Sequence, residues 1–199
     1  MSGGVNGPSP AGRPEGEYRR AQPGGTPVTV RVWDPLVRML HWSLVLSLAV
    51  SWLGAFAISG THQLAGYVAL GIVVLRALWG FVGSRYARFA HFVRGPRATW
   101  AYLQAVLRRR APRHIGHNPL GACMILTLLG CVAGLGLTGW LYTTDAFWGD
   151  AIVEALHVGM AWTLLALAGL HVAGVCCTGG RQPESLLRAM FSGRKRAAD

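Results

Sequence analysis

Apolar residues dominate four stretches of the chain, and each stretch is long enough to cross a bilayer as an α-helix. A crossing helix needs about 20 mainly apolar residues, because the hydrocarbon core is roughly 30 Å thick. Two of the stretches open with Asp34-Pro35 and Asn118-Pro119, in which an N-cap residue precedes a proline. The pattern predicts four transmembrane helices, at residues 36–58, 62–82, 119–141 and 151–178.

Two shorter segments show an apolar side at helical spacing and arginines nearby, which is typical of a helix lying in the membrane interface. The first, residues 96–110, carries Trp100, Leu103, Val106 and Leu107 on one side. The second covers residues 183–191. The predicted fold class is therefore all-α, an integral membrane four-helix bundle with short interfacial amphipathic helices.

The two ends of the chain differ from this middle part. Residues 1–27 are rich in glycine and proline and lack apolar periodicity, so we expect a disordered tail. They contain no apolar core of a signal peptide. Residues 28–180 form the predicted four-helix domain, and residues 181–199 are expected to hold the second amphipathic helix and a basic tail.

The composition agrees with a membrane protein: 52% of the 199 residues are hydrophobic and 14% are charged. A net charge of +11 could indicate nucleic-acid binding, but all 19 Lys and Arg residues fall in three regions. Five lie at or before Arg38, nine between Arg76 and Arg113, and five after Gly180. The positive-inside rule then places both termini and the long basic loop in the cytoplasm. Topology accounts for the basic residues, which argues against nucleic acid as a partner.

Histidines recur in the last apolar stretch at a spacing that brings them onto one helix face. His157 and His171 are fourteen residues apart, which on a helix is about 21 Å and four turns less roughly 40°. His41 lies in the cytoplasmic part of the first predicted helix, and His62 at the outer start of the second. His171 is at the depth of His41 in the membrane, and His157 is at the depth of His62. The predicted pairs are therefore His41 with His171 and His62 with His157. A lone histidine in an apolar segment is often a satisfied core residue, but recurrence in register favours ligands or proton carriers.

Haem suits these pairs better than a free metal ion does, because each pair supplies two neutral nitrogen ligands and no carboxylate or thiolate. Two axial histidines would fill both open positions of the iron, a ligation used for electron transfer. The chain has no C-x-x-C-H, so the haem would be bound non-covalently. A proton relay is the alternative, but it would usually need acids inside the membrane, and Glu154 near one helix end is the only acid within the predicted helices.

Arg76 is the one charged residue in the second predicted helix. It follows His62 by fourteen residues and so shares its face, at about the depth of His171. Its guanidinium could pair with a haem propionate or extend to the cytoplasmic headgroups, and the sequence leaves both open.

Other residues of suitable chemistry are interpreted as structural. His91, His114 and His117 lie in or beside the polar basic loop and are expected to be solvated or next to helix caps. Met160 and the cysteines are read as apolar packing residues: the cysteines are Cys123, Cys131, Cys176 and Cys177.

The sequence resembles the prokaryotic cytochrome b-561 family and the related b-type cytochrome subunits of nickel–iron hydrogenases. The similar motifs lie within residues 30–178 and include VWDPLVRMLHW, THQLAGYVALGIVVLRALWGFVGSRYARF, GHNPLGACMIL, LTGWLYTTDAF and EALHVGMAWTLLALAGLHVAGV, with RAMFSGRKR near the end. The resemblance implies four transmembrane helices, two b-type haems (haem b) with the pairings above, and electron transfer between quinone or quinol and a redox partner.

We therefore expect a cytochrome of the respiratory chain, located in the bacterial inner membrane. Its expected partners are membrane lipid, quinone or quinol, and a redox protein such as a c-type cytochrome. One alternative is an enzyme, a superoxide:quinone oxidoreductase. Another is a haem-containing membrane anchor of a hydrogenase-like or other soluble redox enzyme. The predicted outer loops contain Asp145 and Asp150 and no Lys or Arg, which favours a basic protein over a small anion. The sequence leaves open whether the chain forms a homodimer.

Overall fold

Four long helices carry the structure, a computed structural model that describes residues 29–31, 34–57, 60–85, 87–108, 110, 118–179 and 190–196. All four are long and apolar enough to cross a membrane. They are α1 (Pro35–Ala57), α2 (Thr61–Val82), α5 (Pro119–Tyr142) and α6 (Ala151–Gly179). The predicted all-α membrane bundle is confirmed.

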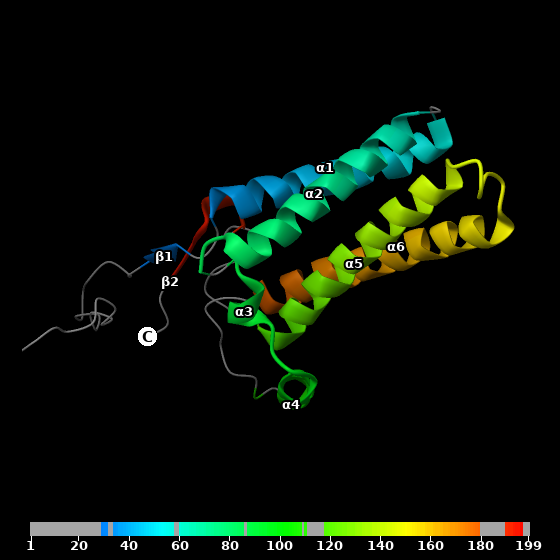
Figure 1. Ribbon diagram of the computed structural model, residues 1–199. Coiled ribbons are helices and arrows are strands. Elements are labelled where there is room, and N and C mark those ends of the chain that lie inside the picture. Colours follow the sequence, from blue (N-terminus) through cyan, green and yellow to red (C-terminus); the bar gives the residue numbers. More distant parts are fainter. Residues whose placement is uncertain are drawn as a thin grey trace, which may run out of the picture.

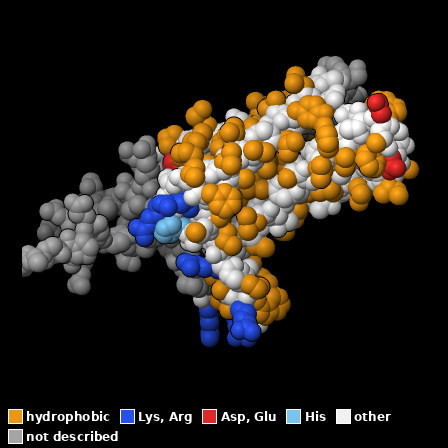
Figure 2. Space-filling view, in the orientation of Figure 1, with side chains coloured by type: hydrophobic (Ala, Val, Ile, Leu, Met, Phe, Trp, Pro, Cys, Tyr) orange, Lys and Arg blue, Asp and Glu red, His pale blue; other side chains and the backbone are white. Residues whose placement is uncertain are grey.

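The helices form two antiparallel hairpins, α1 with α2 and α5 with α6, which pack together mainly through α2 and α5 (Figure 1). The two short connections lie at the same end of the bundle, called here the loop end, which includes Gly60 and residues 143–150. The long connection between α2 and α5 lies at the opposite, basic end. Figure 2 shows Lys and Arg side chains gathered at the basic end and acidic side chains at the loop end. The charges that are segregated along the sequence are therefore also segregated between the two ends of the bundle.

Side-chain caps explain where two of the long helices begin. Asp34 Oδ1 accepts a hydrogen bond of 2.8 Å from the backbone N–H of Val37. Asn118 Oδ1 accepts one of 2.7 Å from the backbone N–H of Gly121. Each bond satisfies a donor that the first turn of a helix leaves unpaired, and the proline that follows the cap has no N–H to satisfy.

Large apolar side chains cover the outside of the bundle. Phe56, Phe81 and Ile152 are 79%, 72% and 72% exposed, whereas the buried core is narrow and centres on Ala69 and Val73 of α2 and Val132 of α5. A soluble protein rarely exposes apolar surface on this scale. The exposed faces are suited to lipid.

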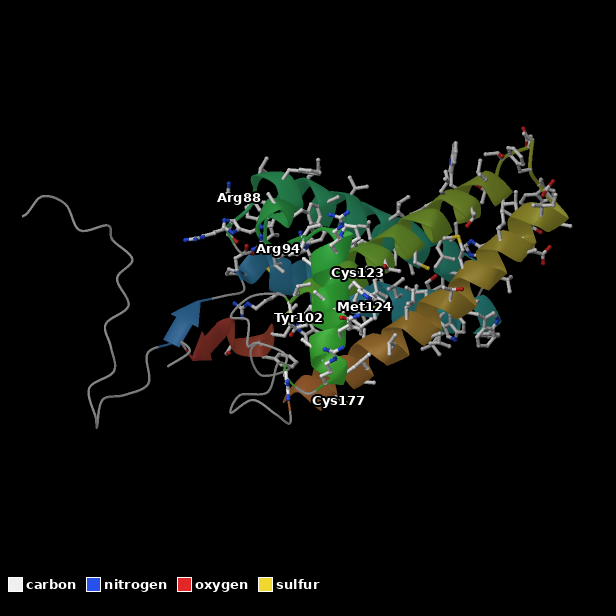
Figure 3. All side chains as sticks on the ribbon, turned by 90° about the horizontal axis from the view of Figure 1, so that it is seen from below. Arg88, Arg94, Tyr102, Cys123, Met124 and Cys177 are labelled. Atoms are coloured by element: carbon white, nitrogen blue, oxygen red, sulfur yellow. The ribbon has the colours of Figure 1, made fainter. Side chains whose placement is uncertain are left out.

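Two short helices, α3 (Phe89–Phe92) and α4 (Pro96–Leu107), lie in the long connection. Figure 1 shows α4 end-on, and the turned view of Figure 3 shows it running across the bundle axis near the start of α5. Trp100 and Leu107 are 62% and 74% exposed, and a hydrogen bond joins the Tyr102 and Asn118 side chains. This is the predicted interfacial helix. It ends at Leu107, three residues before the predicted position 110.

A short antiparallel pairing, which the hydrophobic pattern did not predict, joins two segments far apart in the sequence. The strand β1 (Thr29–Arg31) pairs with β2 (Arg194–Arg196) so that Val30 lies opposite Lys195. Strands of three residues are too short to give a recognisable alternation. The predicted tail at residues 1–27 and most of the predicted helix at residues 183–191 lie outside the described residues.

Candidate cofactor site

One pair of histidine side chains meets near the loop end of the bundle. His62 is in the first turn of α2 and His157 in the second turn of α6, and their ring centroids are 5.9 Å apart with an interplanar angle of 75°. Two imidazoles that share one metal ion, each with a nitrogen–metal bond of about 2 Å, have ring centres roughly 6 Å apart. The separation of these rings therefore suits a single iron between them.

Hydrogen bonds at Nδ1 define how each of these two rings can be protonated. His62 Nδ1 lies 2.8 Å from the backbone carbonyl oxygen of Ser51, which can only accept. His157 Nδ1 lies 2.9 Å from Oγ1 of Thr138, whose hydroxyl hydrogen can be donated to the carbonyl of Gly134 at 2.9 Å. At His62 this arrangement places the proton on Nδ1 and leaves the lone pair of Nε2 for a metal, and at His157 the Thr138 hydroxyl can accept a hydrogen bond from Nδ1 with the same result. Metal-ligating histidines typically make such a bond through the other ring nitrogen.

Glycines allow the neighbouring helices to approach this pair closely. A Cβ atom at Gly139 of α5 would lie 3.2 Å from Cε1 of His157. A Cβ atom at Gly54 of α1 would lie 2.9 Å from the backbone nitrogen of His62. Small residues at helix contacts have this role in membrane bundles. Met160 occupies the space beside Gly134, as expected of a packing residue.

The second pair, His41 and His171, lies toward the basic end. His41 is in the second turn of α1, and the two half-buried rings are close enough for an electrostatic interaction. The His41 ring meets the Trp42 ring edge-on at 5.1 Å. His41 Nδ1 is buried without a hydrogen-bond partner, whereas the Nδ1 atoms of His62 and His157 each have one. The structure thus brings all four predicted ligand residues into the two predicted pairs.

Arg76 is buried, with only 8% of its surface exposed. Its guanidinium lies over the Phe89 ring at 5.4 Å, and NH2 donates a hydrogen bond of 3.4 Å to the carbonyl of Ala87. It also interacts electrostatically with Asp34. A side chain that extended to the headgroups would be exposed, so this placement disfavours that alternative. Its NH1 atom is buried and has no partner.

Four residues that the sequence patterns did not indicate lie beside the two histidine pairs. Ser51 and Thr138 bond the ring nitrogens of one pair. Arg38 and Trp42 flank His41, and each has a buried side-chain nitrogen without a partner. Small polar residues inside apolar stretches, and an arginine three residues before a candidate ligand, are the signals that could have indicated them.

The remaining candidate ligands lie away from both pairs. His91 is exposed in α3, and His114 and His117 lie outside the described residues. Figure 3 shows Cys123 at the start of α5 and Cys177 near the end of α6, and both are exposed free thiols. Within the described parts of the chain, no three His, Cys, Asp or Glu residues converge as a metal site would need. Each histidine pair accordingly offers two protein ligands.

Most of the chain is similar to a known protein family. A family model described as prokaryotic cytochrome b561 matches residues 32–193. The chain is 24% identical to a Ni/Fe-hydrogenase B-type cytochrome subunit of Bradyrhizobium diazoefficiens, over 86% of this chain and 87% of the relative. A protein of the same name from Azotobacter vinelandii is 25% identical over 72% of this chain and 78% of its own length. A Ni/Fe-hydrogenase 1 B-type cytochrome subunit of Escherichia coli is 30% identical over 45% of this chain and 49% of its own. No solved structure matches the chain.

Proposed function

The chain belongs to the prokaryotic cytochrome b561 family, and from this premise we propose that it is a di-haem cytochrome that passes electrons between the quinone pool and a redox partner protein. Family membership and the four long apolar helices support a multi-pass membrane b-type cytochrome that functions in electron transfer. The number of haems, the quinone and the partner are the proposed part.

The observation that carries the proposal is the pair His62 and His157, whose Nδ1 atoms are both hydrogen-bonded so that both Nε2 atoms are left for a metal. A bound haem supplies a one-electron iron centre, and axial histidines on both faces leave no open position for oxygen. Hydrogen bonds from Nδ1 to Ser51 of α1 and Thr138 of α5 would hold the two imidazoles in the tautomer that can ligate a metal through Nε2. His41 and His171 would hold the second haem in the same way.

Two sites at different depths support transfer across the membrane. His157 and His171 both lie on α6, about 21 Å apart along its axis. The basic end corresponds to the cytoplasm of a bacterium by the positive-inside rule, and the loop end then faces outward from the inner membrane. Electrons would pass between the two haems along the bundle.

The partner at the outer face is best matched by a protein. The similar proteins are by name subunits of hydrogenases, which favours a partner that is itself a redox enzyme or carrier. Asp145, Asp150 and Glu154 lie at the loop end, and the sequence has no Lys or Arg between Arg113 and Arg181. Such a surface attracts a basic protein and repels an anion such as superoxide.

The test is a haem assay combined with variants at the ligand pairs. The purified protein should contain two haems per chain and titrate in two redox steps, and a quinol should reduce both. His41→Ala or His171→Ala should remove the haem of the basic end and leave the other. His62→Ala or His157→Ala should do the reverse, and His91→Ala is the control that changes neither. One haem per chain in the unmodified protein would overturn the proposal.

A further inference from the structure

Buried side-chain nitrogens without partners gather at the basic end of the bundle. Within the described residues, four buried side-chain nitrogen or oxygen atoms lack a hydrogen-bond partner, and all four are nitrogens: Arg38 Nε, His41 Nδ1, Trp42 Nε1 and Arg76 NH1. Native proteins pair almost all buried polar groups. The two arginine nitrogens and the indole nitrogen can only donate, and three buried donors without acceptors indicate that the acceptors belong to a bound group.

Within the described residues, no carboxylate is hydrogen-bonded to these donors. Asp34 is the only acidic residue at the basic end within the described residues. Its oxygens accept hydrogen bonds from the backbone of Val37, from Trp79 Nε1 at 3.1 Å and from Ser84 Oγ. No hydrogen bond from the side chain of Arg38 or Arg76 to Asp34 is found in the described part of the chain. Two buried or half-buried cations therefore lack a bonded counterion.

We propose that Arg38 and Arg76 bind the propionates of the haem held by His41 and His171, with Trp42 Nε1 as a third donor. This inference rests on the proposed function, which places a haem between those histidines. Arg38 precedes His41 by three residues, so it lies about 4.5 Å nearer the basic end and about 60° around the helix from it. Guanidinium groups bind carboxylates through two parallel hydrogen bonds, a geometry that lysine cannot provide.

The chain already holds Arg38 in position from its other side. Arg38 NH1 donates a hydrogen bond to the backbone carbonyl of Phe191. The Phe191 ring stacks on the Trp42 ring at 4.7 Å with an interplanar angle of 24°. These contacts leave Nε of Arg38 and Nε1 of Trp42 buried and unpaired on neighbouring positions of α1.

The experiment measures the reduction potential of this haem in Arg38→Gln, Arg76→Gln and the double variant. Loss of a cation beside the propionates should favour the ferric form, so each single variant should lower the potential and the double variant should lower it further. Arg38→Lys should restore only part of the change. Arg85→Gln and Arg88→Gln remove exposed arginines of the same end and should leave the potential unchanged.

A second arm replaces the cofactor. Apoprotein is reconstituted with haem whose propionates are methyl esters, and the effect of Arg38→Gln on potential and haem affinity is measured again. If Arg38 acts through the propionates, its effect disappears with the ester. An equal effect with both haems, or no effect with either, would overturn the inference. Retention of the haem at His62 and His157 shows that each variant is folded.

A wrong haem assignment and a wrong propionate site give different results. If the unmodified protein binds no haem at the basic end, the proposed function is wrong. If it binds that haem and Arg38→Gln changes neither its potential nor its affinity, only the propionate site is wrong.

Discussion

The Nδ1 atom of His157 lies 2.9 Å from the hydroxyl oxygen of Thr138, which stands on the neighbouring helix α5. When that hydroxyl donates to the Gly134 carbonyl, it can accept from the histidine, and the bond orients the ring. The orientation of His157, a proposed haem ligand, therefore depends on a residue of α5, a helix without a proposed ligand.

Thr138→Val keeps the side-chain shape and removes this acceptor. We expect weaker binding of the haem at His62 and His157, by about tenfold or more, as is usual when the partner of a metal-ligating histidine is lost. The potential of that haem should rise, since a less basic imidazole stabilises ferric iron less. Haem transfer to an apoglobin and a redox titration measure the two effects. Thr127→Val removes an exposed hydroxyl of the same helix and serves as the control.

Gly139→Ala tests the close approach of α5 to the same histidine. The added methyl group would lie 3.2 Å from Cε1 of His157 and should displace the ring, lowering occupancy of this haem. Gly130→Ala is the matched change in the same helix, because its Cβ would meet nothing within 4 Å. It should leave haem binding intact and stabilise the helix by about 0.5–1 kcal/mol. Equal loss of haem from both variants would contradict the role given to Gly139.

Asp34 should make the protein more stable at neutral than at acidic pH. Partial burial raises the pKa of its carboxyl, but hydrogen bonds from Ser84, Val37 and Trp79 and the Arg76 charge outweigh burial and lower the pKa below 3.8. A pKa that is lowered in the folded state contributes stability above the unfolded value, and that stability is lost as pH falls through the folded value.

Asp34→Asn keeps an N-cap residue but loses the charge, so it should unfold at a lower temperature than the unmodified protein at pH 7. The difference should shrink once the pH falls below 3.8. Thermal unfolding in detergent, followed by circular dichroism across this range, measures it. A difference that stays constant with pH would assign the effect to packing instead of charge.

The membrane orientation can be tested with reporter fusions. A reporter that is active only outside the cytoplasm should work when fused after residues 59 and 145. A reporter that is active only in the cytoplasm should work when fused after residue 109, because the basic loop resists translocation. Activity outside for the fusion at residue 109 would reverse the topology and with it the assignment of the outer haem.

The acidic loop end should steer a basic partner. Asp145→Asn and Asp150→Asn should slow reduction or oxidation by a basic redox protein at low salt, and the rate of the unmodified protein should fall as salt rises. Asparagine at position 150 preserves the cap that Asp150 gives to the N–H groups of Ile152 and Val153. Stopped-flow mixing measures both rates. Fast, saturable reduction by superoxide at physiological salt would favour the small-anion alternative.

Local patterns predicted the helices and placed the histidines of each pair at matching depths. They could not reveal contacts between helices. Asp34-Pro35 and Asn118-Pro119 mark where α1 and α5 begin because a cap acts within one turn. The bond from His157 to Thr138 and the stacking of Phe191 on Trp42 depend on how separate helices cross. The role of the four histidines as ligands remains a prediction that haem analysis must test.

The helix α6 runs without a break from Ala151 to Gly179, and it contributes one histidine to each pair. Each inserted residue would advance the following chain by about 1.5 Å and rotate it by about 100°. A single insertion or deletion between His157 and His171 would therefore turn one imidazole away from its partner, although many substitutions there would leave both in place. The separation of the two proposed haem sites is therefore set by the number of residues between His157 and His171, and it is insensitive to most substitutions in that segment.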